Sequence, residues 1–256
     1  FPTRRSSDLI IGIGGSATND AGLGMLQALG FRFYDQNGEI LGKGGQILDQ
    51  IVAIDFSSVH PALKDARFTI ACDVRNPFSG PEGAAYVFAR QKGADGAMIE
   101  KLDAGMKRFS RLIHSTTGRE ITEVAGAGAA GGLGGAFLAF LNAELKPGIE
   151  LLLRTLKFDE KIKDADLIIT GEGRVDRQSV MGKVPFGILE EANKQGIPVI
   201  VVAGSIADTE VLNKAGFRGI FSIVPSPMSL EVAMKPEAAK NNISRTVAQI
   251  ISLATL

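Results

Sequence analysis

The sequence predicts an α/β protein built around a largely parallel sheet with helices on both faces. Short, mostly β-branched apolar runs bounded by glycine or charge alternate with segments of helical length and spacing. The chain has 256 residues with 45% hydrophobic content, so it can bury a sizeable core as one large domain or two smaller ones. A disordered chain is therefore excluded.

The individual elements follow from these runs in chain order. Strands are expected at residues 9–13, 68–72, 167–170, 199–203 and 220–224. Helices are expected at residues 20–29, 83–91, 97–113, 132–142, 180–194 and 236–254. The pair Asn37-Gly38 after residues 31–34 is typical of a hairpin turn, which predicts a mixed sheet in the first half. The second half is more regular and predicts a Rossmann-like, mainly parallel sheet.

The ends and the middle of the chain give its domain organisation. Residues 1–8 have neither helical nor strand periodicity but run straight into an apolar strand, so we expect them to be a non-native leader. A domain junction is expected between Lys146-Pro147-Gly148 and Lys157. The resulting domains are 9–155, with a mixed sheet, and 156–256, the Rossmann-like part, which we expect to lack N-terminal strands.

Charge and cysteine content narrow the class of protein. Lys+Arg and Asp+Glu both number 28, which removes the global positive field that nucleic-acid or anionic-membrane binding uses. The single cysteine, Cys72, cannot form an internal disulfide. No apolar run reaches the ~18 to 20 residues of a membrane-spanning helix. These observations predict a cytoplasmic protein with a small-molecule ligand, and they do not predict its oligomeric state.

Glycine is concentrated where the predicted strands end. The chain has 31 glycines in 256 residues, above the ~7% average. Ligands of open α/β sheets bind at the carboxyl ends of strands, where glycine lets backbone N–H groups approach phosphate. Four segments therefore become candidates for a site.

The first segment, residues 12–20, follows a strand and precedes a helix. Its amides at Gly14 and Gly15 suit an anion, and Ser16 or Thr18 can cap the helix. Asp20 near the helix start is favoured by the helix dipole whether or not it has a function. The alternative interpretation is a tight turn with a helix cap.

The second segment, residues 72–80, places Asp73 at a strand end, followed by Arg75 and Asn76. A carboxylate there can hold Mg²⁺ or orient a hydroxyl. The alternative is an Asx-turn that only satisfies nearby backbone amides.

The third segment, residues 126–135, presents almost pure backbone around Gly128 before an apolar helix. Close packing of that helix on the sheet would require the same small residues. The composition alone therefore leaves anion binding and packing open.

The fourth segment, residues 170–178 with 182–185, carries Glu172, Arg174, Asp176 and Lys183 near a strand end. Two carboxylates with nearby cations suit a site that handles both metal and phosphoryl charge. A surface salt-bridge cluster is the alternative.

Two familiar nucleotide-binding motifs were compared with these segments. A Walker A loop has the pattern Gly-x-x-x-x-Gly-Lys-Ser/Thr. Around Gly182-Lys183 this pattern would need glycine at position 177 and Ser or Thr at position 184, but these residues are Arg and Val, so the motif is excluded. The spacing Gly12-x-Gly14-x-x-Ala17 satisfies the dinucleotide fingerprint, with Asp35 as the candidate ribose-binding acid. A NAD(P)-dependent dehydrogenase of a small hydroxy acid therefore remains an alternative.

The chain resembles the bacterial glycerate kinase family in four segments that occur in the same order. They are GGSATND, CDVRNPFSG followed by VFARQKGA, GAGAAGGLG and ITGEGRVDRQ. The resemblance implies two α/β domains flanking a cleft and ATP-dependent, Mg²⁺-assisted phosphorylation of D-glycerate, with 2-phosphoglycerate favoured as product. Family members begin with a segment containing an Asp-Ser-Phe-Lys-Gly motif and also carry an acidic Gly-Gly-Glu-Gly motif. Both are absent here, so we expect an N-terminally truncated member, and an inactive fragment is a further hypothesis.

Site roles are assigned by residue type and placement under this hypothesis. The catalytic candidates are Asp73, Asp176, Arg174 and Lys183. The nucleotide-binding candidates are Gly14, Gly15, Ser16, Thr18, Gly128, Gly171 and Gly173. The substrate-binding candidates are Asn19, Asp20, Arg75 and Asn76, and the metal-binding candidates are Asp73, Asp176 and Glu172. Arg75 or Arg174 could instead grip the substrate carboxylate, because a guanidinium matches it in a bidentate way.

Overall fold

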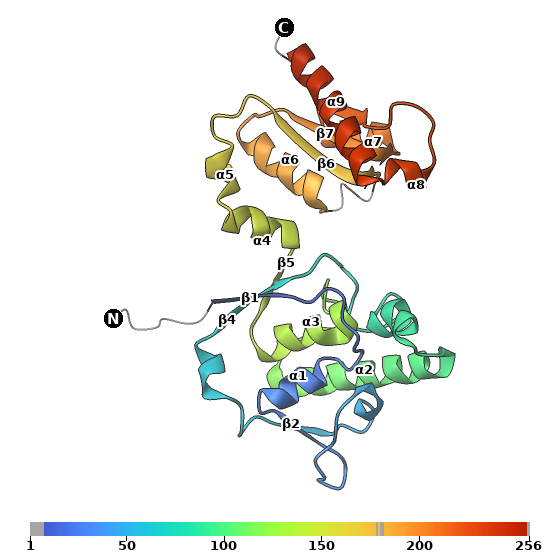
Figure 1. Cartoon of the computed structure of the whole chain (residues 1–256). Coiled ribbons are helices and arrows are strands. Elements are labelled where there is room, and N and C mark those ends of the chain that lie inside the picture. The colour runs from blue at the N-terminus through green and yellow to red at the C-terminus, as the bar shows by residue number, and fades with distance from the viewer. Residues whose placement is uncertain (1–7, 178, 180–181, 255–256) are drawn as a thin grey trace. The chain divides into compact units, whose positions relative to one another are not determined.

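The computed structural model describes residues 8–177, 179 and 182–254, and it divides the chain into two units, Phe1–Gly148 and Ile149–Leu256 (Figure 1). The division falls before the predicted junction at 155, because helix α4 (Gly148–Thr155) belongs mostly to the second unit. There Ile149 packs closely on Gly187. Residues 1–7 of the predicted leader lie outside the described residues, and Asp8 is the first residue of a strand.

The main sheet of the first unit is parallel, with strand order β1-β4-β5. Its strands are β1 (Asp8–Gly12), β4 (Arg67–Ala71) and β5 (Glu144–Lys146). The registers Gly12↔Ala71 and Ala71↔Lys146 bring the three carboxyl ends to one edge. The loops that follow these strands therefore start side by side, which is the placement expected for a ligand site in an open α/β sheet.

A small antiparallel pair, β2 (Arg32–Tyr34) with β3 (Ala53–Asp55), accompanies the parallel sheet. The predicted turn at Asn37-Gly38 is present, because Asp35 N–H donates to the Glu39 carbonyl and Tyr34 bridges Ile40. Gly38 has φ 78°, a conformation that glycine adopts readily. The antiparallel structure predicted in the first half is thus confirmed, although it forms a two-stranded sheet of its own and the two kinds of pairing do not share one mixed sheet.

The helices of the first unit pack around the amphipathic helix α2 (Gly96–Thr117). Asp95 caps its start by accepting a hydrogen bond from Met98 N–H at 2.8 Å, and Gly118 ends it in the left-handed conformation. Its buried apolar residues recur at helical spacing: Ile99, Met106, Phe109 and Ile113. Helix α3 (Ala129–Phe140) lies alongside it (Figure 1), and α1 (Leu23–Ala28) completes this core.

The second unit holds a parallel sheet of order β6-β7-β8. The strands are β6 (Ile168–Val175), β7 (Val199–Ile206) and β8 (Gly219–Ser222). Alternate residues of β7 face opposite sides: Val199 and Val201 pack with α6 (Val184–Lys194), whereas Ile200 and Val202 pack with α9 (Pro236–Ala254). Helices thus cover both faces, and the prediction of an α/β protein with mainly parallel sheets is confirmed.

The remaining helices are short and were not predicted. They are α5 (Phe158–Lys161), α7 (Thr209–Ala215), α8 (Leu230–Ala233), η1 (Gly45–Ile47) and η2 (Pro61–Lys64). The predicted helix at 83–91 is a π-helical turn, η3 (Ala85–Ala89), followed by a 3₁₀ turn, η4 (Arg90–Lys92). The predicted helix at 180–194 begins at Val184, and residues 180 and 181 lie outside the described residues.

Candidate active site

The loop after β1 exposes a run of unused backbone donors. Among the described residues, the N–H groups of residues 14–19 have no protein acceptor. Gly15 has φ 69°, and open space surrounds the position where a side chain on Gly14 or Gly15 would lie. Successive free N–H groups next to open space are a typical setting for an anion.

Lys92 reaches this loop from the end of η4. Its Nζ donates to Ser16 Oγ at 2.9 Å and to the Thr18 carbonyl at 2.5 Å. Burial lowers the pKa of Lys92, and the negative charge of Asp20 opposes that shift. Gly93, with φ 97°, ends the turn directly after Lys92 and holds the lysine in place. The loop therefore carries a cation as well as backbone donors.

Asp73 begins the loop after β4. Its Oδ1 accepts a hydrogen bond from Gly148 N–H at 2.8 Å, which joins this loop to the segment after β5. Its Oδ2 has no protein donor among the described residues, and the side chain is exposed. The carboxylate is thus fixed on one side and available on the other.

These groups share one cavity of about 240 Å³. Its lining comes from the ends of β1 and β4, from η3 and η4, and from the start of α3. Gly14, Gly15, Ser16, Asp73 and Lys92 all line it. The structure therefore brings together the first and second predicted segments, and it adds a lysine that no prediction included.

Asp20 is buried, at 8% exposure, and both of its carboxylate oxygens are already used. Oδ1 accepts from Gly22 N–H at 3.1 Å, and Oδ2 accepts from Gly24 N–H at 3.0 Å. Asp20 thus holds the start of α1, whereas the prediction that Ser16 or Thr18 caps this helix is wrong: the helix begins at Leu23, its N-cap residue is Gly22, and Ser16 Oγ accepts from Lys92. Asn19, next to Asp20, has buried amide atoms that find no hydrogen-bond partner among the described residues.

The third segment packs closely on the first two. The N–H groups of Gly126 and Gly128 donate to the Asn76 carbonyl at 3.2 and 3.0 Å. A Cβ on Gly128 would lie 2.1 Å from the Pro77 carbonyl oxygen, and one on Gly131 would lie 2.2 Å from that of Thr18. The small residues thus serve the packing interpretation here, and the N–H of Gly128 is occupied within the fold.

The remaining substrate-binding candidates lie beyond the cavity lining. Asn76 Nδ2 donates to the Glu82 carbonyl at 2.8 Å, so its side chain fastens its own loop. Arg75 is exposed and has no partner among the described residues. Neither contributes to the 240 Å³ cavity.

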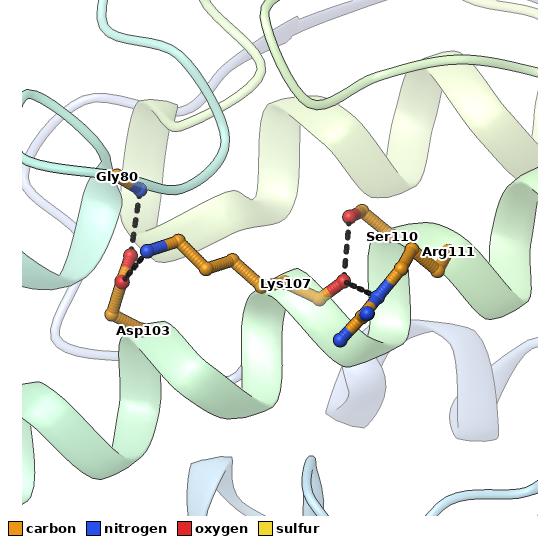
Figure 2. A network of polar contacts seen from close by, with 5 residues as sticks. All are labelled: Gly80, Asp103, Lys107, Ser110 and Arg111. Carbon is orange, nitrogen blue, oxygen red and sulfur yellow. Dashed lines mark hydrogen bonds and ion pairs between the residues drawn. The ribbon is translucent and has the colours of Figure 1, made fainter.

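A buried carboxylate anchors the loop that carries Asp73. Figure 2 shows Asp103 of α2 between Gly80 and Lys107: Oδ1 accepts from Gly80 N–H at 2.7 Å, and Oδ2 lies 2.7 Å from Lys107 Nζ. Asp103 is 3% exposed. The hydrogen bond to Asp103 raises the pKa of Lys107. This network ties the far end of the 72–80 loop to the longest helix of the unit.

The fourth predicted segment is a strand and not a loop up to Val175. Gly171 pairs with Val202 and Arg174 with Ser205, because the β6–β7 ladder continues past the predicted end of the strand at 170. Gly171, Glu172 and Gly173 line an apolar cavity of about 740 Å³ in the second unit. Their backbones therefore present a strand beside a cavity, in place of the expected loop.

The charged residues of that segment make contacts with each other and with the next loop. Arg174 Nε lies 3.1 Å from Asp176 Oδ2, and Arg177 pairs with Asp208. The hydrogen bonds from Arg177 lower the pKa of Asp208. Lys183 is exposed and precedes α6. Arg174 and Asp176 thus form the ion pair that the salt-bridge interpretation expects. Gln178, at the end of this segment, lies outside the described residues.

Magnesium fits the donor set at Asp73. The described residues contain no group of three or more His, Cys, Asp or Glu side chains that could enclose a metal ion. Magnesium in kinases is usually held by one or two carboxylates together with substrate phosphates and water, so it needs no such group. The free Oδ2 of Asp73 is one oxygen of that kind.

Asp35, the acid required by the dehydrogenase alternative, belongs to the hairpin turn. Its carboxylate accepts hydrogen bonds from Asn37 N–H at 2.8 Å and Glu39 N–H at 2.9 Å. The Glu39 bond is the largest cause that lowers the pKa of Asp35. This geometry favours a turn-forming role over ribose binding.

Comparison with known proteins decides the family. The model of the glycerate kinase family matches residues 3–255. This chain belongs to the glycerate kinase family. The resemblance carried by the four segments is thus confirmed.

Relatives within the glycerate kinase family cover most of this chain. A glycerate kinase of Halalkalibacterium halodurans is 47% identical over 92% of this chain and 64% of its own length. A glycerate 2-kinase of Escherichia coli is 46% identical over 94% of this chain and 63% of its own length. The crystal structure of a provisionally assigned glycerate kinase 2 of Salmonella typhimurium superposes with a TM-score of 0.79 at 41% identity, covering 97% of this chain and 65% of that one. The chain therefore spans less than two thirds of the length of these family members.

Among the described residues, no helix is both long and apolar enough to cross a membrane. Lys92 is the residue of the candidate site that sequence reasoning missed. It lies inside the VFARQKGA stretch, but 76 positions separate it from Ser16, and nothing in the spacing couples the two. The glycine that follows Lys92 is the one local signal of a fixed position.

Proposed function

We propose that this chain takes part in the ATP-dependent phosphorylation of D-glycerate, with 2-phosphoglycerate as the product. The observation that carries the proposal is the single cavity in which free backbone donors, a lysine and the Asp73 carboxylate meet. Membership of the glycerate kinase family supports the choice of substrate and reaction. The proposal assigns both the anion-binding and the acidic elements of a phosphoryl-transfer site to the first unit.

In the proposed reaction, a hydroxyl oxygen of glycerate forms a bond to the γ-phosphorus of ATP while the bond to the ADP oxygen breaks. Asp73 orients the hydroxyl and accepts its proton through the free Oδ2. The backbone donors of Gly14, Gly15 and Ser16 hold the anionic substrate beside Asp73. Because Asp73 has one free oxygen, holding Mg²⁺ is the alternative to this role, and the ion, when bound there, would neutralise phosphate charge.

The second unit is proposed to bind the nucleotide. Its cavity of about 740 Å³ beside Gly171 and Gly173 lies within the range of small-molecule sites. Arg174, Lys183 and Asp176 are proposed to handle phosphate charge, with Glu172 or Asp176 as further metal ligands. Asp176→Asn should then reduce kcat on the order of 10²-fold or more. Unchanged turnover would remove Asp176 from the site.

The test follows two products in parallel. ADP release is measured with D-glycerate and Mg·ATP, and NADH absorbance is measured with NAD⁺ and small hydroxy acids, both on this 256-residue chain. We expect ADP release that depends on D-glycerate, and NMR of the product should show phosphate on the 2-hydroxyl. NADH formation would favour the dehydrogenase alternative, and inactivity in both assays would favour an inactive fragment.

A further inference from the structure

Lys92 belongs to two cavities of the first unit. One is the 240 Å³ cavity beside Gly14 and Asp73. The other has a volume of about 300 Å³ and is lined by η1, by the start of α2 and by Asn19. Lys92 lines both, and its ammonium group contacts Ser16, which lines the 240 Å³ cavity.

The positive charge of Lys92 has no carboxylate partner at contact distance. Its two hydrogen bonds go to neutral oxygens, Ser16 Oγ and the Thr18 carbonyl. None of the ion pairs between described side chains includes Lys92. An ammonium group has three N–H donors, so one remains for a ligand. A partly buried charge with a spare donor favours an anionic ligand.

The cavity that Lys92 shares with Asp73 is lined by a hydrogen-bond acceptor as well as by donors. Asp73 supplies a carboxylate oxygen without a protein donor, while Lys92 and the free N–H groups of Gly14 and Gly15 supply donors and positive charge. A molecule that satisfies both needs an anionic group and a hydroxyl group on a short carbon chain. A small hydroxy-carboxylate has that composition, whereas a neutral polyol lacks the anionic group.

We propose that Lys92, with the backbone N–H groups of Gly14 to Ser16, binds the carboxylate of the hydroxy acid and thereby makes the site select acids over neutral analogues. The identity of the acid as glycerate rests on the proposed function. The two arginines considered for this role fit less well, because Arg75 does not line the cavity and Arg174 lies 3.1 Å from Asp176 in the second unit.

The test compares an acid with its uncharged analogue. D-Glycerate and glyceramide are titrated into this chain without nucleotide, and binding is followed by calorimetry and by NMR shifts. We expect the wild-type chain to bind the acid about 10- to 100-fold more tightly than the amide, as a charge-assisted hydrogen bond would give. Lys92→Met should abolish that preference and leave glyceramide binding within about threefold.

A matched variant and a second substitution keep the test decisive. Lys64→Met removes an exposed lysine of η2 in the same unit and should retain the preference. If circular dichroism shows that Lys92→Met does not fold, Lys92→Gln replaces it. The ratio of the affinities of the wild-type chain for D-glycerate and glyceramide is measured without either variant. Wild-type chain that fails to bind D-glycerate at millimolar concentration, or that binds glyceramide equally well, overturns the proposal. So does a preference that survives in Lys92→Met or is lost in Arg75→Met alone.

Inorganic phosphate separates the two possible sources of the anion. If phosphate binds more tightly than D-glycerate, competes with it and depends on Lys92, the site belongs to the phosphoryl group and the carboxylate assignment is overturned. Chain that binds D-glycerate through Lys92 but releases no ADP leaves this inference intact and contradicts the proposed reaction. Conversely, if ADP release depends on D-glycerate and its KM is unchanged in Lys92→Met, the proposed reaction stands and the role of Lys92 in binding the acid is contradicted.

Discussion

The first and fourth glycine-rich segments both follow an apolar strand in the sequence, but they differ in structure. Residues 14–19 leave their strand and form a loop whose N–H groups have no protein acceptor among the described residues. Residues 171–175 stay in β6 and pair with β7. Glycine after an apolar strand therefore does not by itself predict a loop, because the length of the neighbouring strand decides where the ladder ends.

The length of the neighbouring strand gives the physical reason. β4 ends at Ala71, in register with Gly12, so no partner continues beyond that point. β7 continues to Ile206, so Gly171, Glu172, Arg174 and Val175 each have a partner residue in β7. The first segment thus exposes donors to a ligand, and the fourth places side chains along a strand beside an apolar cavity.

The largest expected effect is at Asp73, which distinguishes the polar cavity of the first unit from the apolar cavity of the second. Asp73→Asn should lower kcat about 10²- to 10⁴-fold, because the amide cannot accept the hydroxyl proton. Its carbonyl oxygen can still accept from Gly148 N–H, so the melting temperature should change little. Steady-state ADP release and thermal unfolding measure the two quantities.

An unchanged kcat in Asp73→Asn would contradict the assignment of Asp73 to the reacting hydroxyl. Asp65→Asn is the matched control, because Asp65 is an exposed carboxylate of the same unit that lies outside the cavity. Its kcat should equal that of the wild-type chain.

The second prediction compares the effect on stability of a glycine in the third segment with that of a glycine in the fourth. Gly131→Ala should lower the free energy of unfolding by about 2 to 4 kcal/mol, because the new Cβ would lie 2.2 Å from the Thr18 carbonyl at φ 72°. Gly173→Ala should change it by less than about 0.5 kcal/mol, because nothing lies within 4 Å of its Cβ position. Denaturant titration measures both, and equal effects would contradict the difference in packing.

Much of the parallel framework could be predicted from the sequence. The apolar run at Val199 and the Asn37-Gly38 turn were strong local signals, and each lies where expected. The run at Ile220 also forms a strand, but it spans Gly219–Ser222 in place of residues 220–224 and is only partly buried. Three-residue strands such as β5 were missed, because so short a segment carries no periodicity and owes its conformation to its neighbours.

The candidate site was predictable only where local chemistry decides it. Asp73 follows a buried strand, so its place at the sheet edge could be inferred from sequence. Lys92 depends on a contact between positions far apart in the chain, and the end of β6 depends on its partner strand. Such tertiary contacts leave no mark in the spacing of one segment.

The third prediction concerns the buried amide of Asn19. Both amide atoms lack a partner among the described residues, and an unsatisfied buried polar group costs about 1 to 3 kcal/mol. Asn19→Leu, which removes both atoms at similar size, should raise the free energy of unfolding by about 1 kcal/mol. If Asn19 serves the substrate, the same variant should bind D-glycerate more weakly. A less stable variant would contradict the first expectation and indicate that the amide is satisfied in solution.

The smallest expected effect uses Cys72, which lines the same cavity as Asp73 and Lys92. Burial is the main cause that raises the pKa of the Cys72 thiol, and the charge of Asp73 adds to it. Less thiolate is therefore present at a given pH, so iodoacetamide should react more slowly than with a free cysteine, and the pH–rate curve should shift to higher pH. Asp73→Asn should move that curve slightly back toward lower pH.

Saturating D-glycerate should slow the alkylation of Cys72 several-fold, because a ligand between Lys92 and Asp73 would cover the thiol. Glyceramide at the same concentration should protect less, because it lacks the charge that Lys92 is proposed to bind. Mass spectrometry of the labelled chain gives both rates. Equal alkylation rates with and without D-glycerate would show that the acid does not bind between Lys92 and Asp73. The free N–H groups of the loop in the first unit would then not distinguish it from the strand of the second unit as a substrate site.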